Sequence, residues 1–156
     1  MIAPHPDDEA VGCAGTIVRH KKCGDAVCVA YITDGRRSGA LGLGSEEMAS
    51  RRRQEAESSA KALRIDRFEW FGLAEGNWSC EQLQLLLAAL INQFSPQVIY
   101  APSRVDFHTE HHKVAYGCAQ LMSGSEVKAS APWMRVYQVH VPLTPILTNL
   151  VADISG

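Results

Sequence analysis

Long apolar stretches are absent from this sequence, and so is any excess of charge of one sign. No apolar run approaches the roughly 20 residues that a membrane-spanning helix needs, so we predict no membrane span. Basic and acidic residues number 15 and 17, and the densest basic run, residues 51–53, stands among glutamates. This balance gives no reason to expect nucleic acid or an anionic membrane surface as a partner.

The cysteines lack the pairing that a disulfide framework would need. Five are present, an odd number, and no two are spaced as Cys-x-x-Cys. Free thiols in a reducing compartment are therefore expected, and with no secretory leader in view we predict a cytoplasmic protein. A Gly-x-Gly-x-x-Gly turn is also missing, because residues 12–15 are Gly-Cys-Ala-Gly. This spacing disfavours a dinucleotide-binding protein.

What is present is an alternation of β-rich and helical segments along a single domain, residues 1–156. Apolar residues at helical spacing predict helices over residues 8–22, 45–63, 80–94 and 109–122. Short β-rich runs predict strands over residues 26–33, 67–71, 97–101, 134–141 and 147–154. Strands joined by helical crossovers pair in parallel, which predicts an α/β, Rossmann-like, mostly parallel sheet flanked by helices. Ligands of such sheets bind beyond the carboxyl ends of the strands.

Two compact clusters combine imidazole with carboxylate groups. The first is Ala-Pro-His-Pro-Asp-Asp-Glu at residues 3–9, and the second is Asp-Phe-His-Thr-Glu-His-His at residues 106–112. Zinc takes nitrogen and oxygen ligands, and a catalytic site supplies three protein ligands and leaves one position for water. Together the two clusters offer enough donors for such a site.

Spacing suggests how those donors would be used. His5 and Asp8 stand three residues apart where an extended segment turns into a helix, so both can face one point. Either His108 or His111 could complete the set. Asp7 would then be a spare carboxylate beside a ligand, as general-base hydrolysis requires, and the spare histidine could stabilise an oxyanion or protonate a leaving amine.

Plainer interpretations exist for the same residues. Residues 7–9 could be acids favoured by the helix dipole, and the histidines could line a solvated loop. The occurrence of both clusters in one short chain favours a site. His20 and His140 stand alone and are predicted to be structural or at the surface. Trp78 could stack on a sugar face or cap the edge of the core.

The segment PHPDDEAVGCAGTI resembles the signature of the LmbE-like, or PIG-L, de-N-acetylase superfamily, and HTEHHKVA is similar to its second signature. Thr-Asp-Gly at residues 33–35, Arg52 with Glu55, and residues 152–155 resemble further family positions. The resemblance implies a zinc-dependent de-N-acylase that hydrolyses the amide of an N-acetyl amino-sugar-like substrate or glycoconjugate.

The resemblance also implies roles for individual residues. The zinc ligands would be His5, Asp8 and His111. Asp7 would be the general base and His108 the partner of the oxyanion or leaving group. Two further residues, Arg52 and Asp106, fall at positions that the family uses near its substrate pocket.

Two departures concern the second signature. The family has Asp where this chain has Glu110, and the longer side chain changes how far an acid that orients His108 would reach. His112 is an alternative to His111 as the third zinc ligand. Adjacent helix positions point about 100° apart, so only one of the two can be the ligand.

A third departure is that only Met1 and Ile2 precede Ala3, where the family places a buried strand. The chain is thus expected to be trimmed at both ends relative to the family. Sheet edges left unpaired by a short first strand are adhesive, so a homo-oligomer is expected. The alternative function is a catalytically impaired relic of the fold that acts as a binding or assembly module.

Overall fold

The computed structural model describes residues 1–39, 41–124 and 132–140. Strands and helices alternate through them in this order: β1 (Ile2–Ala3), α1 (Asp8–Lys22), β2 (Cys28–Thr33), α2 (Ser45–Ala62), β3 (Arg67–Leu73), α3 (Cys80–Phe94), β4 (Val98–Pro102), α4 (Thr109–Ser123) and β5 (Trp133–Tyr137). The predicted helices are confirmed to within one residue at their ends. The predicted strand at 134–141 is instead β5, and the one at 147–154 lies outside the described residues.

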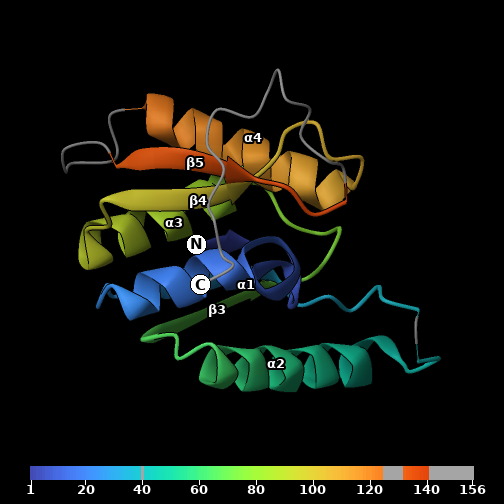
Figure 1. The fold of residues 1–156 in the computed structure, drawn as a ribbon. Helices are drawn as coiled ribbons and strands as arrows, with labels where there is room; N and C mark the ends of the chain where they lie inside the picture. The colour runs from blue at the N-terminus through green and yellow to red at the C-terminus, as the bar shows by residue number, and fades with distance from the viewer. Residues whose placement is uncertain (40, 125–131, 141–156) are drawn as a thin grey trace.

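All the strand pairs of the described residues are parallel. β1 pairs with β2 and β2 with β3, while β4 pairs with β5. β1 also lies against β4, so the strands follow the spatial order β3-β2-β1-β4-β5. Figure 1 shows α1 crossing in front of the strands, α2 beside β3 and α4 beside β5. The predicted α/β, Rossmann-like sheet flanked by helices is therefore confirmed.

The sheet buries both faces, since alternate residues of a strand point to opposite sides. Ile2, Ala30 and Ile32 pack in one core cluster with side chains of α3 and α4. Ala3 and Tyr31 pack in the other cluster, with side chains of α1 and α2. No helix in the described part of the chain is long and apolar enough to cross a membrane.

Polar residues follow the carboxyl ends of the central strands, as predicted. The loop after β1 holds residues 4–7, Asp34 follows β2, Glu75 follows β3, and Asp106 follows β4. Because these strands are parallel, their carboxyl ends meet at one edge of the sheet. The two clusters at residues 3–9 and 106–112 thus come together although about a hundred residues separate them.

Gly12 lies where α1 comes close to the end of β5. A Cβ at this position would lie 2.5 Å from Cδ2 of Tyr137 and 3.0 Å from the carbonyl oxygen of Gln138. The Tyr137 ring has little freedom to retreat, because its hydroxyl donates a 2.8 Å hydrogen bond to the Ile2 carbonyl. A side chain at residue 12 would therefore push α1 away from the sheet.

We expect Gly12→Ala to lower the free energy of unfolding by about 1–2 kcal/mol, measured by urea denaturation. The direction of this change in unfolding free energy is informative, because Gly→Ala inside a helix otherwise raises that free energy by roughly 0.5–1 kcal/mol. Gly39→Ala is the matched control, since a Cβ there meets nothing within 4 Å. A Gly12→Ala variant as stable as the parent would show that α1 and Tyr137 do not pack this closely.

Candidate metal centre

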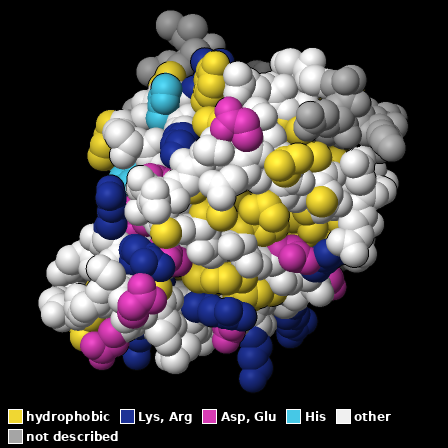
Figure 2. All heavy atoms as spheres, turned by 180° about the vertical axis from the view of Figure 1, so that it is seen from behind, with side chains coloured by type: hydrophobic (Ala, Val, Ile, Leu, Met, Phe, Trp, Pro, Cys, Tyr) yellow, Lys and Arg dark blue, Asp and Glu magenta, His cyan; other side chains and the backbone are white. Residues whose placement is uncertain are grey.

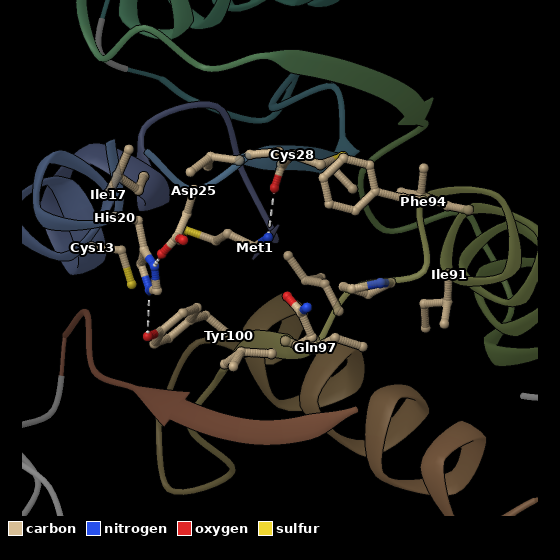
Figure 3. A pocket seen from close by; sticks show the side chains of 18 of the residues that line it. Met1, Cys13, Ile17, His20, Asp25, Cys28, Ile91, Phe94, Gln97 and Tyr100 are labelled. Atoms are coloured by element: carbon tan, nitrogen blue, oxygen red, sulfur yellow. Dashed lines mark hydrogen bonds and ion pairs between the residues drawn. The ribbon is translucent and has the colours of Figure 1, made fainter. Parts of the chain in front are cut away.

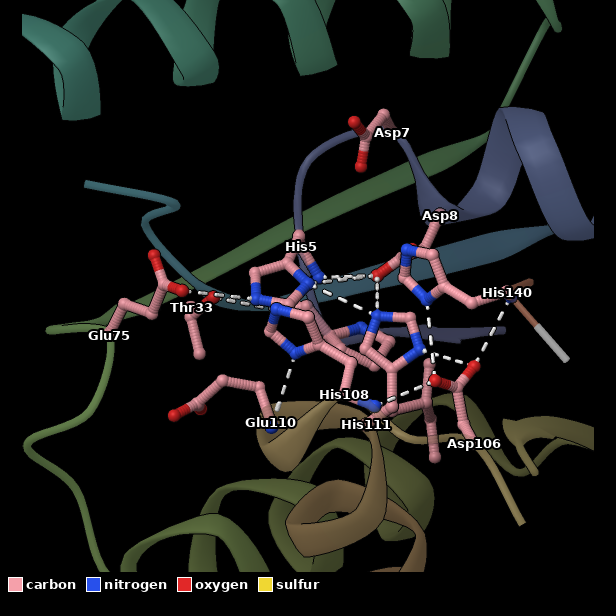
Figure 4. A network of polar contacts seen from close by, with 12 residues as sticks. His5, Asp7, Asp8, Thr33, Glu75, Asp106, His108, Glu110, His111 and His140 are labelled. Atoms are coloured by element: carbon pink, nitrogen blue, oxygen red, sulfur yellow. Dashed lines mark hydrogen bonds and ion pairs between the residues drawn. The ribbon is translucent and has the colours of Figure 1, made fainter. Parts of the chain in front are cut away.

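The loop between β1 and α1 is fixed at its first residue. The Pro4 carbonyl accepts hydrogen bonds from the backbone N–H of Thr33 at 3.0 Å and from its hydroxyl at 2.8 Å. Four residues on, the Asp8 carboxylate accepts from the His5 backbone N–H at 2.7 Å. This short turn directs the side chains of His5 and Asp8 toward the start of α4, as Figure 4 shows.

Three side-chain atoms from the two clusters meet at one point. Nδ1 of His5 lies 3.2 Å from Nε2 of His111 and 3.4 Å from Oδ2 of Asp8. The third distance, from Nε2 of His111 to Oδ2 of Asp8, is 3.1 Å. Ligands about 2.0–2.1 Å from a tetrahedral zinc ion stand roughly 3.3 Å apart. The nearly equilateral triangle of donors therefore fits zinc.

Neighbouring charges and burial together determine the protonation of His5 and Asp8. Burial acts to lower the pKa of His5, but hydrogen bonds to Asp8 and Glu75 outweigh it and raise that pKa to about 9. Burial acts to raise the pKa of Asp8, but hydrogen bonds from His111 and His5 hold it well below the usual range. At neutral pH Asp8 is thus ionised and His5 is protonated, so a metal ion would bind here by displacing the proton of His5.

Asp106 contacts the ring nitrogen of His111 that faces away from the donor triangle. Its Oδ2 lies 3.2 Å from Nδ1 of His111, on the side of the ring away from Asp8. A carboxylate at Nδ1 fixes the proton there and leaves Nε2 free to bind a metal. The buried Asp106 also accepts from the His108 backbone N–H at 2.9 Å. Its predicted contact with substrate stays a prediction.

His108 stands beside the triangle rather than in it. Its ring meets that of His5 edge-on, with the centroids 4.6 Å apart. As the N-cap of α4, its Nδ1 accepts from the Glu110 backbone N–H at 3.3 Å, so the neutral ring carries its proton on Nε2. Burial, then the neighbouring His5 and His111, lower the pKa of His108. The ring is thus a neutral hydrogen-bond donor. His5, His108 and His111 also form a possible ligand set, in which one ring nitrogen of each lies within 4.8 Å of the others.

Asp7 is not brought against the three donors. Figure 4 shows its carboxylate apart from the cluster, and half of the side chain is exposed. Oδ2 accepts a 2.7 Å ion-paired hydrogen bond from Arg52 on α2, which also bonds Glu55. The predicted general base and the predicted substrate-binding arginine therefore hold each other outside the donor triangle.

Glu110 turns away from His108. Its carboxylate accepts from the Gly76 backbone N–H at 3.1 Å and from Nε1 of Trp78 at 2.6 Å. These two hydrogen bonds tie α4 to the loop that follows β3. Trp78 is buried in the core beneath, which favours the core interpretation of this residue.

We expect Trp78→Phe to lower the free energy of unfolding by about 1–3 kcal/mol, because buried Glu110 loses a donor. Urea denaturation followed by circular dichroism measures the change. Trp133→Phe is the matched control at a tryptophan that is 71% exposed. Equal stability of the two variants would mean that the indole N–H contributes nothing to the link between Glu110 and the loop.

The remaining histidines divide as follows. His112 is exposed while His111 is fully buried, so His111 is the one turned to the centre. His20 lies elsewhere, bonded to Asp25 and Tyr100. His140 lies at the surface, as predicted, and it also reaches the centre: Nδ1 lies 3.3 Å from Oδ1 of Asp106 and the ring stacks on His108. It stands 28 residues after the end of the second cluster, so no local motif could reveal it.

Comparison with known proteins gives one family and several structures. A family model described as GlcNAc-PI de-N-acetylase, PIG-L, matches residues 1–122. The chain is similar to N,N'-diacetylchitobiose deacetylase from Pyrococcus horikoshii, with 22% identity and a TM-score of 0.84 over 99% of this chain and 62% of that one. It is also similar to a conserved protein from Thermus thermophilus, with 24% identity and a TM-score of 0.74 over 92% of this chain and 67% of that one.

A third similar structure is the 4-carboxy-2-hydroxymuconate hydratase of Pseudomonas putida KT2440, at 18% identity and a TM-score of 0.73 over 88% of this chain and 62% of that one. At such identities the likeness establishes the fold alone. Since a hydratase and a deacetylase both have this fold, the reaction has to be argued from the site.

Proposed function

Because the chain belongs to the GlcNAc-PI de-N-acetylase, or PIG-L, family, we propose that it is a zinc-dependent N-deacetylase acting on an N-acetyl amino sugar or glycoconjugate. The observation that supports zinc is the triangle formed by His5, Asp8 and His111, with sides of 3.1–3.4 Å. One carboxylate and two imidazoles leave a fourth position for water, as catalytic zinc sites do.

Zinc bound there would polarise the acetyl carbonyl and lower the pKa of its water toward about 7. The protein's part is proton handling. Asp7 would take the proton of the attacking water, for which its carboxylate has to turn from Arg52 toward the centre. The Nε2–H of His108 would donate a hydrogen bond to the oxygen on which negative charge develops, and the proton that Asp7 takes from the water would pass to the leaving nitrogen.

The proposed activity is tested by acetate release from an N-acetylglucosamine conjugate. We expect turnover from zinc-loaded protein, loss of turnover with a chelator, and recovery when zinc is restored. Stoichiometric zinc without acetate release from any amide would favour the catalytically impaired binding module. Hydration of an unsaturated acid without acetate release would instead place the chain with the hydratase.

We further propose that the chain forms a homo-oligomer through β5. Among the described residues β5 pairs only with β4, and three of its side chains are exposed: Trp133, Met134 and Val136. Such an apolar strand at the edge of a sheet favours association. Figure 2, which views the molecule from behind, shows a band of hydrophobic side chains across that face, a second surface that association could cover.

We expect light scattering at micromolar concentration to give an oligomer for the parent and a smaller species for Val136→Lys, since a charge on the edge opposes pairing. Val105→Lys is the control at another half-exposed valine outside the strands. A clean monomer of the parent with a cooperative thermal transition would refute the proposal.

A further inference from the structure

The ring of His5 has a second nitrogen that lies outside the donor triangle. Nδ1 belongs to the triangle, whereas Nε2 is buried and makes no well-formed hydrogen bond to the described residues. Oε1 of Glu75 lies 3.5 Å from Nε2, and Figure 4 shows this carboxylate beside the ring. A buried polar atom without a close hydrogen bond is costly, so the position of Glu75 requires an explanation.

His20 shows how an ordinary histidine of this protein is satisfied. Its Nδ1 lies 2.7 Å from Oδ2 of Asp25, and its Nε2 lies 2.9 Å from the hydroxyl of Tyr100 (Figure 3). Both ring nitrogens are thus at hydrogen-bonding distance from an oxygen. The ring of His5 instead faces Asp8 at 3.4 Å and Glu75 at 3.5 Å. It therefore lies between two carboxylates without a close hydrogen bond to either.

Glu75 is held in this position by the loop that follows β2. Its Oε2 accepts a 2.9 Å hydrogen bond from the backbone N–H of Arg37, and its own backbone N–H donates to Oδ1 of buried Asp34 at 3.2 Å. Interaction with His5 is the largest influence on the pKa of Glu75 and lowers it, so the carboxylate is ionised at neutral pH. One carboxylate oxygen is thus used by the loop, and the other, Oε1, remains for His5.

The two histidines of the triangle are arranged in opposite ways. His111 directs Nε2 to the triangle and has the Asp106 carboxylate at Nδ1. His5 directs Nδ1 to the triangle and has the Glu75 carboxylate at Nε2. When a metal binds one nitrogen of a neutral imidazole, the other nitrogen carries the proton, and a carboxylate there orients the ring and makes it a stronger ligand. Each histidine therefore has a carboxylate of its own, from a different loop.

Glu75 itself is not placed to bind the metal. Its Oε1 lies at the nitrogen of His5 that is outside the triangle, and neither group of possible metal ligands among the described residues includes Glu75. An effect of Glu75 on the metal would therefore pass through His5.

We propose that Glu75 is the positioning residue for the zinc ligand His5: its carboxylate accepts the Nε2 proton and so assigns Nδ1 to the metal. On zinc binding the Nδ1 proton is lost to solvent, while the Nε2 proton stays in its contact with Glu75. This role depends on the proposed zinc site but not on the proposed reaction.

Competition with a zinc-sensitive dye tests this role in the full chain. We expect Glu75→Gln, which keeps the shape of the side chain but removes its charge, to lower zinc affinity by about 10–100-fold. Glu57→Gln is the matched control, because Glu57 is half-exposed on α2 and pairs with Arg53. Its zinc affinity should stay within a factor of about two of the parent. Thermal transitions show whether both variants are folded.

NMR of histidine ring protons separates positioning from a general effect on the loop. In protein saturated with zinc and isotopically labelled at histidine, His5 should carry its proton on Nε2 and His111 on Nδ1. In Glu75→Ala the His5 proton should exchange with solvent at least about tenfold faster than in the parent, because a buried N–H that has lost its acceptor is less protected. The His111 proton should exchange at the parental rate.

Either of two results would overturn the role of Glu75. One is a folded Glu75→Gln variant whose zinc affinity is within a factor of about two of the parent. The other is a His5 that binds zinc through Nε2, or whose Nε2 proton exchanges at the parental rate in Glu75→Ala, which would leave Glu75 as a support of the loop. A parent protein that binds no zinc would refute the zinc site itself, so failure of the site and failure of the role are distinct. None of these readouts depends on acetate release.

Discussion

Replacing His111 by alanine should remove zinc from the protein, with an affinity at least about 100-fold below that of the parent. His111 supplies one corner of the donor triangle, and it is fully buried between Asp8 and Asp106. Mutation of a residue that only orients a zinc ligand typically lowers zinc affinity by 10–100-fold. Loss of a ligand itself should therefore lower the affinity further. Metal content after dialysis and competition with a zinc-sensitive dye measure the effect.

The neighbouring His112→Ala is the matched control for this result. His112 is on the same helix turn but exposed, so its removal should leave zinc affinity within a factor of about two. Asp8→Ala should behave as His111→Ala does. Stoichiometric zinc at parental affinity in the His111 variant would refute the assignment, and His108 would be the next candidate because it lies within 4.8 Å of His5.

Replacing Asp7 by asparagine should retain zinc and lower kcat by roughly 10²–10⁴-fold, the usual cost of removing a general base. The amide is nearly isosteric with the carboxylate but cannot accept the proton of the attacking water. Acetate release measures kcat, and the zinc content of the same sample separates loss of a base from loss of the metal.

Arg52 complicates this experiment and provides its control. The asparagine also weakens the 2.7 Å ion pair with Arg52, so lower activity could reflect a displaced loop. Arg52→Gln removes the same ion pair but keeps the Asp7 carboxylate, and its kcat should exceed that of Asp7→Asn. If Asp7→Asn turns over within a factor of a few of the parent, Asp7 is a structural residue at the start of α1 and the proposed proton transfer is wrong.

The sequence was most informative where the chemistry is local. His5 and Asp8 share one turn, and the apolar spacing of residues 80–94 marks a helix whose bounds the structure reproduces. His140 could not be found in this way, since only the path of the chain after β5 brings it to Asp106. The partner of Glu110 was equally hidden, because Trp78 approaches it from another loop.

Asp7 illustrates a different limit. A motif identifies a residue, but the direction of an exposed side chain depends on neighbours from other elements. Here that neighbour is Arg52, which is 45 residues away and holds the Asp7 carboxylate outside the donor triangle.

The meeting of the two clusters has a consequence for how the molecule would come apart. His5 and His111 are 106 residues apart in the chain, and a zinc ion held by both would close that span as a cross-link does. Without the ion, the loop after β1 would lose this cross-link to α4, and its amides should open and exchange with solvent before those of β2. Metal loss and opening of this loop would then be one event, so the protein's lifetime in a chelating environment would depend on a few residues.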